Sequence, residues 1–120
     1  MRTGIIVFGH GSSVESANEA VRVIARQAAE HGAWELYETA FLEASPVLGE
    51  AVAALVSRGA GEILVLPYFL TLGIHLQRDL PKLVEALARE HGLSIRVTPP
   101  LDGHVHLSRI LVERAREASL

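Results

Sequence analysis

The chain lacks several residue types that would point to common functions. It has 120 residues and no cysteine, which excludes disulfides, thiolate metal sites and a thiol nucleophile. This absence also fits a reducing compartment. Aromatic residues make up only 5% of the chain, so we expect an aliphatic core. Lys82 is the only lysine and the net charge is −3, which argues against a general nucleic-acid binder, because such proteins present a basic face.

Long apolar runs are also missing. No run approaches the ~20 residues that a membrane-spanning helix needs. The N-terminus lacks the charged-then-apolar pattern of a secretory signal. We therefore expect one domain over residues 1–120, located in the cytoplasm, with neither a membrane nor a nucleic acid as partner.

Apolar strands alternate with helical patterns four times along the chain. We expect strands over 4–8, 34–41, 63–68 and 94–98, and helices over about 13–32, 45–58, 79–92 and 105–117. Ser12 with Glu15, Ser45-Pro46, and Asp79 with Pro81 are the expected helix starts. The alternation predicts an α/β fold with a single open four-stranded parallel sheet, strand order 2-1-3-4 and helices on both faces.

His10 and His75 occupy matching places in this plan, because each follows an apolar strand and precedes a helix. Loops that leave the carboxyl ends of parallel strands share one edge of the sheet, where ligands bind. Imidazole is both a common metal ligand and a base near neutral pH. The two histidines therefore predict a site at this edge, although His10 between two glycines could also be an incidental residue of a tight turn.

Charged residues near both histidines have two interpretations each. Glu43 follows the second strand and can complete a metal site or hold a proton, but it could equally be a surface glutamate beside a helix start. Arg78 can bind a carboxylate or phosphate, or be solvated. Asp79 is best explained as a helix cap.

Two aromatic residues after the third strand are also ambiguous. Tyr68 and Phe69 fit either the core or a pocket wall.

Three segments together resemble a known family. They are Gly9-His10-Gly11-Ser12, Ala40-Phe41-Leu42-Glu43 and the run 73–81, GIHLQRDLP, with a weaker fourth signature at Pro100-Leu101 and Gly103-His104. In order and spacing they are similar to the small, single-domain sirohydrochlorin chelatases of the CbiX type. The resemblance covers nearly the whole chain and implies half of a class II chelatase fold.

The resemblance implies a lyase that inserts a divalent metal, Co²⁺ or Fe²⁺, into sirohydrochlorin for cobalamin or sirohaem biosynthesis. It makes His10 and His75 the catalytic and metal-binding histidines and Glu43 the assisting acidic ligand. The metal (Co²⁺, Fe²⁺ or Ni²⁺) is a substrate, and no tightly bound cofactor is expected. The expected substrate-binding residues come from the loops around both histidines: Ser12, Ser13, Leu72, Gly73, Ile74 and Arg78.

Two other functions remain open. A non-catalytic metal or tetrapyrrole carrier would use the same histidines. A histidine-type phosphatase is disfavoured, because Gly9 and Gly11 flank His10 where an arginine would have to hold the phosphoryl group. One small domain offers a single wall to a large macrocycle, so we expect a homodimer whose histidine-bearing edges face a shared cavity. Its candidate interface residues are Leu70, Leu72, Ile74 and Leu76.

Overall fold

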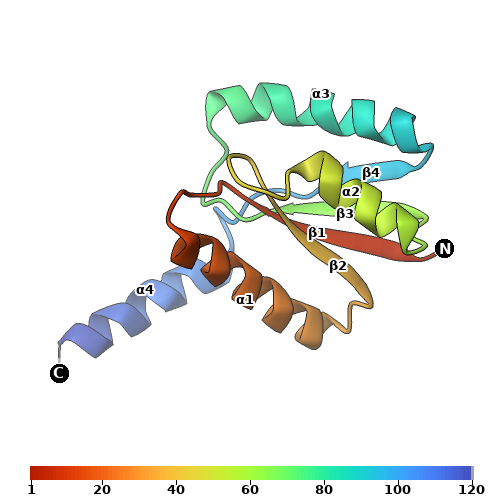
Figure 1. Cartoon of the computed structure of the whole chain (residues 1–120). Coiled ribbons are helices and arrows are strands. Elements are labelled where there is room, and N and C mark those ends of the chain that lie inside the picture. The colour runs from red at the N-terminus through yellow and green to blue at the C-terminus, as the bar shows by residue number, and fades with distance from the viewer. Residues whose placement is uncertain (120) are drawn as a thin grey trace.

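The computed structural model describes residues 1–119, in which four parallel strands alternate with four helices (Figure 1). The strands are β1 (Thr3–Gly9), β2 (Leu36–Phe41), β3 (Glu62–Pro67) and β4 (Ser94–Val97). The helices are α1 (Glu15–Gly32), α2 (Leu48–Ser57), α3 (Ile74–His91) and α4 (Val105–Ala118). The sheet order is β2-β1-β3-β4, which confirms the predicted α/β fold and strand order. Within the described residues, no helix has the length and apolar character needed to cross a bilayer.

The main hydrophobic core lies between the sheet and the layer formed by α2 and α3. Ile6 and Phe8 of β1 and Ile63 and Val65 of β3 face this layer and are fully buried. Helix α2 packs on β1 and β2, α3 packs along β4, and the two helices touch each other. Helix α1 covers β1 and β2 from the opposite face, as Figure 1 shows.

The predicted starts of α1 and α2 are wrong by a few residues. Helix α1 follows Val14, and Ser12 accepts a hydrogen bond from the Val14 amide at 2.9 Å instead of capping the helix. Helix α2 follows Val47, beyond Ser45, and the Glu50 carboxylate accepts from the Val47 amide at 2.9 Å. A side chain inside the first turn of α2 therefore satisfies the free amide, where the sequence suggested a cap before it.

The start of α3 differs most from the prediction, and the difference changes the setting of His75. The helix begins at Ile74 with Gly73 as its N-cap, so Asp79 lies inside the helix and does not cap it. Pro81 is likewise an interior residue. It has no amide to donate to the Gln77 carbonyl, so the helix continues with one hydrogen bond fewer. His75 therefore stands in the first turn of a helix and not in a loop.

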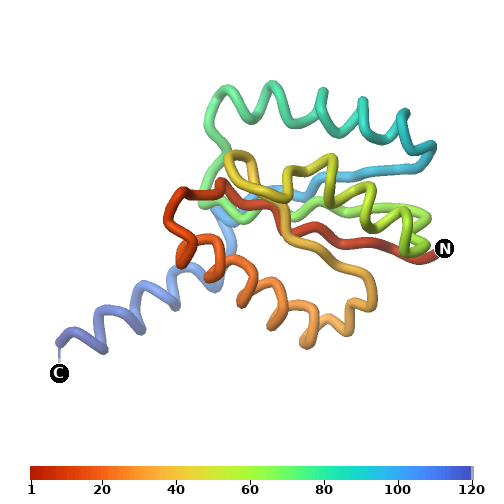
Figure 2. Tube along the Cα trace, in the orientation of Figure 1, coloured from red at the N-terminus to blue at the C-terminus, as the bar shows by residue number. Residues whose placement is uncertain are grey.

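Helix α4 stands away from the rest of the molecule, as the trace in Figure 2 shows. It contains no buried residue, and its Val105 and Leu111 are 67% and 71% exposed. The radius of gyration is 15.3 Å, against about 13.6 Å for a compact domain of this length. The helix is present where the sequence predicted it, but it does not pack on the sheet.

Candidate active site

The loops that follow β1 and β2 are joined by backbone hydrogen bonds. The Leu42 amide donates to the Gly9 carbonyl at 3.0 Å, and the Glu43 amide donates to the His10 carbonyl at 2.8 Å. These bonds continue the parallel pairing of β1 with β2 past the ends of the strands. The main chain thus places Glu43 beside His10, which explains why two residues far apart in the sequence meet at the carboxyl edge.

The His10 and Glu43 side chains form an open pair. The His10 Nδ1 lies 3.8 Å from the Glu43 Oε2 and 2.9 Å from the Gly11 carbonyl oxygen. A carbonyl oxygen can only accept, so Nδ1 carries the proton in the neutral ring and Nε2 keeps its lone pair. The side chains are 60% and 65% exposed, so both remain accessible from solvent. An oriented imidazole with a free Nε2 is the arrangement that metal-binding histidines usually have.

Two residues hold the His10 loop in shape. Gly11 has φ +85°, and a Cβ there would come within 2.9 Å of Phe41, so this position needs glycine. Asn18 of α1 is 4% exposed, and its amide group both accepts from the Ser12 amide and donates to the Ser12 carbonyl, each at 2.8 Å. Sequence reasoning missed Asn18. The available signal was a polar residue on the same helical stripe as Val21.

Phe69 forms a wall beside His10. The two rings meet edge to face with centroids 6.5 Å apart, and Phe69 also packs against Phe8 at 5.8 Å. The Tyr68 amide donates to the Phe8 carbonyl at 2.7 Å, which brings the segment after β3 to the end of β1. Of the two aromatic residues left open by the sequence, Phe69 is therefore a wall of the site, and Tyr68 is 41% exposed.

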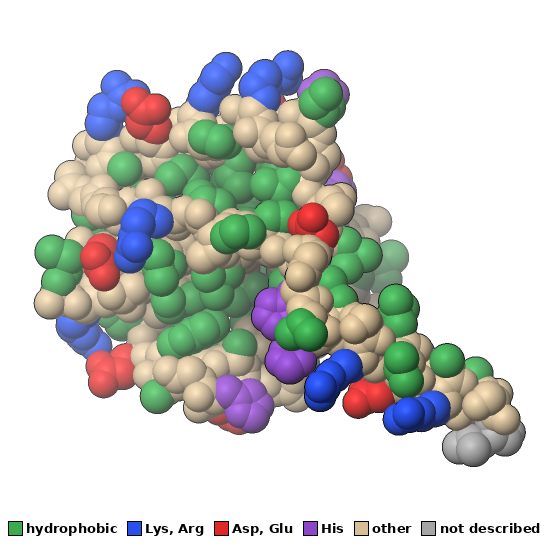
Figure 3. All heavy atoms as spheres, turned by 180° about the vertical axis from the view of Figure 1, so that it is seen from behind, with side chains coloured by type: hydrophobic (Ala, Val, Ile, Leu, Met, Phe, Trp, Pro, Cys, Tyr) green, Lys and Arg blue, Asp and Glu red, His purple; other side chains and the backbone are tan. Residues whose placement is uncertain are grey.

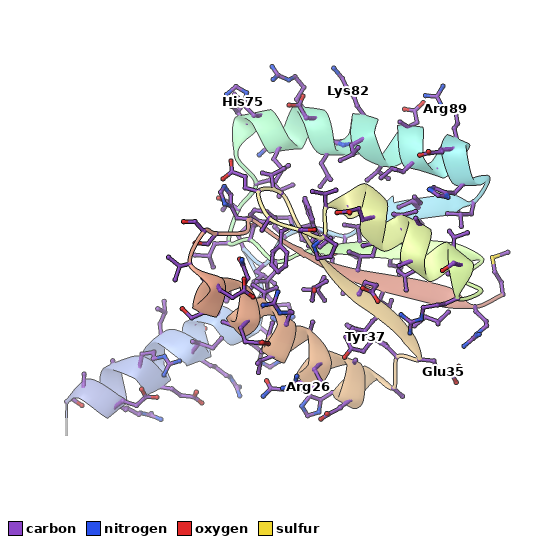
Figure 4. The ribbon with its side chains drawn as sticks, viewed as in Figure 1. Arg26, Glu35, Tyr37, His75, Lys82 and Arg89 are labelled. Carbon is purple, nitrogen blue, oxygen red and sulfur yellow. The ribbon has the colours of Figure 1, made fainter. Side chains whose placement is uncertain are left out.

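His75 has different surroundings. It lies in the first turn of α3, on the outer side of the helix, as Figure 4 shows. Its Nδ1 is 3.2 Å from the Arg78 Nη2, and Arg78 also donates to Asp79 at 3.0 Å. A guanidinium can only donate, so the Nδ1 of His75 is the acceptor and Nε2 carries the proton in the neutral ring. The hydrogen bond and charge of Arg78 lower the pKa of Asp79, and Asp79 raises the pKa of Arg78.

The structure brings together only part of the predicted metal site. Within residues 1–119, no three histidine or acidic side chains are placed to hold one metal ion. His10 and Glu43 form a pair, and His75 lies outside it. The place of His75 as a third ligand stays a prediction.

The predicted substrate-binding residues lie in two places, the loop after β1 and the segment around the start of α3. Ser12 is half-buried and Ser13 is exposed, but Glu15 already occupies the first turn of α1, which weakens an anion site at that helix N-terminus. Leu72 is half-buried and Gly73 is exposed. Ile74, the first residue of α3, is 79% exposed. Arg78 is 60% exposed and is the cation nearest to His75.

These features define an open α/β domain with an imidazole–carboxylate pair at the carboxyl edge of a parallel sheet, the edge where such domains bind ligands. The profile of the CbiX family matches residues 4–118, and the chain belongs to that family.

Individual relatives agree with this assignment. A sirohydrochlorin cobaltochelatase from Methanopyrus kandleri is 36% identical over 81 residues, which are 67% of this chain and 57% of that protein. The crystal structure of a CbiX protein from Marinobacter aquaeolei is 31% identical, with a TM-score of 0.85 over 97% of this chain and 96% of that one.

A longer protein shares the fold. The sirohydrochlorin chelatase SirB from Bacillus subtilis subspecies spizizenii, solved in complex with cobalt, is 24% identical and has a TM-score of 0.89. The match covers 98% of this chain and 51% of that chain, in agreement with the predicted half of a class II chelatase fold. The chain spans about half the length of the first curated relatives that it matches, from 38% to 62%.

Proposed function

We propose that this protein is a lyase that inserts a divalent metal, Co²⁺ or Fe²⁺, into sirohydrochlorin, in the biosynthesis of cobalamin or sirohaem. The observation that supports this most directly is the pair of His10 and Glu43, joined through the backbone at the carboxyl edge with the His10 Nε2 free. Membership of the CbiX family supports the choice of substrate.

The reaction needs a ligand and a proton acceptor in one place. A hydrated metal ion must lose water, and two pyrrole N–H groups must each release a proton as the metal binds their nitrogens. The Nε2 of His10 can bind a borderline metal such as Co²⁺ or Fe²⁺. Glu43 adds a carboxylate that can complete the coordination or accept a pyrrole proton. Two protein donors leave coordination positions open for transfer of the metal to the macrocycle.

At the start of α3, Arg78 and His75 can act one after the other. Arg78 occupies the Nδ1 of His75 in the structure. A substrate carboxylate that binds the guanidinium as a bidentate partner would draw Arg78 away. The lone pair of His75 would then be free to bind the metal or accept a proton. Substrate binding by Arg78 would thereby activate the second histidine.

The remaining substrate contacts come from the two loops. Ser12 and Ser13 can donate hydrogen bonds to carboxylates of the macrocycle. Leu72, Gly73 and Ile74 supply apolar and backbone surface, and the exposed Ile74 is the side chain best placed to contact a flat ring.

The openness of this edge supports a homodimer. The side chains of His10 and Glu43 are largely exposed, so one copy encloses a substrate on one side only. A second copy with its histidine-bearing edge facing the first would close the cavity. Among the candidate interface residues, Leu70 and Ile74 are 67% and 79% exposed, while Leu72 is half-buried and Leu76 packs against the core. Leu70 and Ile74 are therefore the better candidates.

A turnover assay tests the proposal. Purified protein is mixed with an excess of sirohydrochlorin and Co²⁺, Fe²⁺ or Ni²⁺, and the metallated product is followed by absorbance. We expect many equivalents of product per chain, above the uncatalysed rate. The variant His31→Ala is a matched control, because His31 lies in the last turn of α1, away from the carboxyl edge. Product that stops at one equivalent would identify a carrier and contradict the proposed enzyme.

A further inference from the structure

A row of three aromatic rings, those of Phe8, Phe69 and His10, runs from the hydrophobic core to the candidate site. Phe8 and His10 lie two residues apart at the end of β1, and side chains two apart in an extended chain face the same way. The half-buried Phe69, which follows β3, packs against both, with ring centroids 5.8 Å from Phe8 and 6.5 Å from His10. Because Phe8 is 1% exposed, this contact anchors the Phe69 ring to the core.

The polar contacts of His10 leave the tilt of its ring open. The Nδ1 lies 2.9 Å from the Gly11 carbonyl oxygen and 3.8 Å from the Glu43 Oε2. Both contacts act on the same nitrogen, so they fix one atom of the ring but not the ring plane. The Phe69 ring stands at 76° to the imidazole, edge to face, which is a preferred arrangement of aromatic pairs. Phe69 therefore supplies the restraint on the ring plane that the polar contacts lack.

The backbone of Phe69 is held on two sides. The Tyr68 amide donates to the Phe8 carbonyl at 2.7 Å, and the Leu101 amide donates to the Phe69 carbonyl at 2.9 Å. Leu101 belongs to the loop that leads into α4, and Figure 3 shows hydrophobic and histidine side chains gathered where that protruding helix meets the body of the domain. This loop, which contains the weaker fourth family signature, therefore supports Phe69 through a backbone amide.

We propose that Phe69 is a positioning residue for metal insertion: its ring fixes the plane of the His10 imidazole, so that Nε2 meets each metal ion at the same place and angle. This role rests on the proposed function, because it adds Phe69 to the same site. A phenyl ring has neither a lone pair for the metal nor a base for the pyrrole protons, so Phe69 takes no direct part in the chemistry. Transfer of the metal from Nε2 to the macrocycle depends on geometry, and a misplacement of about 1 Å can cost ~100-fold in rate.

A direct contact between Phe69 and the macrocycle is the competing role, and kinetics separate the two. A residue that only binds the substrate raises KM when it is removed and leaves kcat unchanged. A residue that orients His10 lowers kcat when it is removed, because the complex with the substrate still forms but reacts from a less favourable geometry. The ratio of the two effects therefore identifies the role of Phe69.

Steady-state kinetics with sirohydrochlorin and Co²⁺ test the proposal on Phe69→Leu, which keeps apolar bulk against Phe8 but removes the ring beside His10. We expect kcat to fall by ~10–100-fold, with KM within about twofold of the wild type. Leu93→Ala is the matched control, because Leu93 is also half-buried against the same core but precedes β4 at the opposite edge of the sheet. Its kcat should stay unchanged. An unchanged kcat in Phe69→Leu, whether or not KM rises, or an equal loss of kcat in Leu93→Ala, would overturn the proposal.

Nuclear magnetic resonance of the protein without metal or substrate tests the contact independently of turnover, at an alkaline pH where imidazole is neutral. In the wild type we expect cross-relaxation between the ring protons of His10 and Phe69, and ring-nitrogen shifts of His10 that show one tautomer, with the proton on Nδ1. In Phe69→Leu the ring should swing and break its bond to Gly11, so the His10 nitrogen shifts should move toward the average of two tautomers, while those of His31 stay unchanged.

Two results of this measurement would contradict the positioning role. They are the absence of cross-relaxation in the wild type and unchanged His10 nitrogen shifts in Phe69→Leu. A wild type that shows the contact but no turnover would instead contradict the proposed function and leave the orientation of His10 by Phe69 intact.

Discussion

The two histidines of the edge are held in opposite ways. His10 follows β1 in a loop fixed by backbone bonds to Leu42 and Glu43 and by the buried Asn18. His75 stands on the first turn of α3, where Arg78 is its one side-chain hydrogen-bond partner in the described structure. The first imidazole is oriented before any ligand arrives, and the second depends on a contact that a ligand can displace. A fixed group suits metal binding and a displaceable one suits a step triggered by substrate.

Removing each imidazole should have the largest effect. We expect His10→Ala and His75→Ala each to lower turnover by at least ~100-fold, the usual loss for a group that transfers a proton. Both side chains are exposed, so the melting temperature should change little. Steady-state kinetics with Co²⁺ and thermal unfolding measure the two effects. A variant that keeps wild-type turnover would take its histidine out of the mechanism.

Two glycine substitutions compare the rigidity of the backbone beside His10 with that of the backbone beside His75. Gly11→Ala forces an alanine into φ +85° with its Cβ 2.9 Å from Phe41, which should lower the free energy of unfolding by about 1–3 kcal/mol. Gly73→Ala places a Cβ in open space at φ −66°, which should lower it by less than ~1 kcal/mol. Denaturant unfolding of both variants measures the two changes in unfolding free energy. Equal losses of unfolding free energy would show that the loop of His10 is no more constrained than the start of α3.

The contribution of Asn18 can be separated from that of His10. Asn18→Ala leaves the Ser12 amide and carbonyl without partners, which should lower the free energy of unfolding by about 1–3 kcal/mol. Turnover should fall as well, because the loop carrying His10 loses its anchor, while His75 is untouched. Glu19→Ala, at an exposed neighbour on α1, is the control. Lost stability with unchanged turnover would mean that Asn18 supports the fold but does not position His10.

The smallest effect is expected at Asp79. Asp79→Asn frees Arg78 from its ion pair at neutral pH, so substrate carboxylates should compete better for the guanidinium. The pair is exposed and therefore weak, so KM should fall by less than about fivefold. In the wild type, Arg78 holds the pKa of Asp79 below its usual 3.8, so the pair is present above that pH and is lost as the pH falls through the lowered pKa. An increase in KM would indicate that Asp79 orients Arg78 and does not compete for it.

The sequence predicted the sheet and the meeting of His10 with Glu43 at its carboxyl edge. Apolar runs ending in glycine-rich turns identify the strands, and the strand order places residues 10 and 43 at one edge, so the pair could be found without coordinates. The start of α3 was missed because Gly73 offers no polar capping side chain, while Asp79 and Pro81 together imitate a helix start. His75 and Arg78 can form their hydrogen bond because both lie in α3, three residues apart. The sequence analysis placed His75 in a loop before the helix, so it did not predict this bond.

Two further features could not be read from the sequence. Asn18 interrupts an apolar stripe, which marks it as unusual but does not tell which backbone groups it binds. For α4, the periodicity predicts an amphipathic helix, and amphipathicity says only that one side needs a partner surface. Whether that surface lies in the same chain depends on the direction set by the bonds at Leu101 and Asp102.

The core between the sheet and the α2–α3 layer has a kinetic consequence. Its buried residues all come from one chain, from Ile6 to Leu87, and Leu93, Ile95 and Val97 of the same chain pack against them, so a single copy can fold without waiting for a partner. If turnover requires the proposed homodimer, refolding should occur in two phases. Circular dichroism and core protection should recover at a rate independent of protein concentration, whereas turnover should recover in a later, second-order phase that slows on dilution. In freshly synthesised protein, catalytic activity would therefore lag behind folding by a time set by the abundance of the chain.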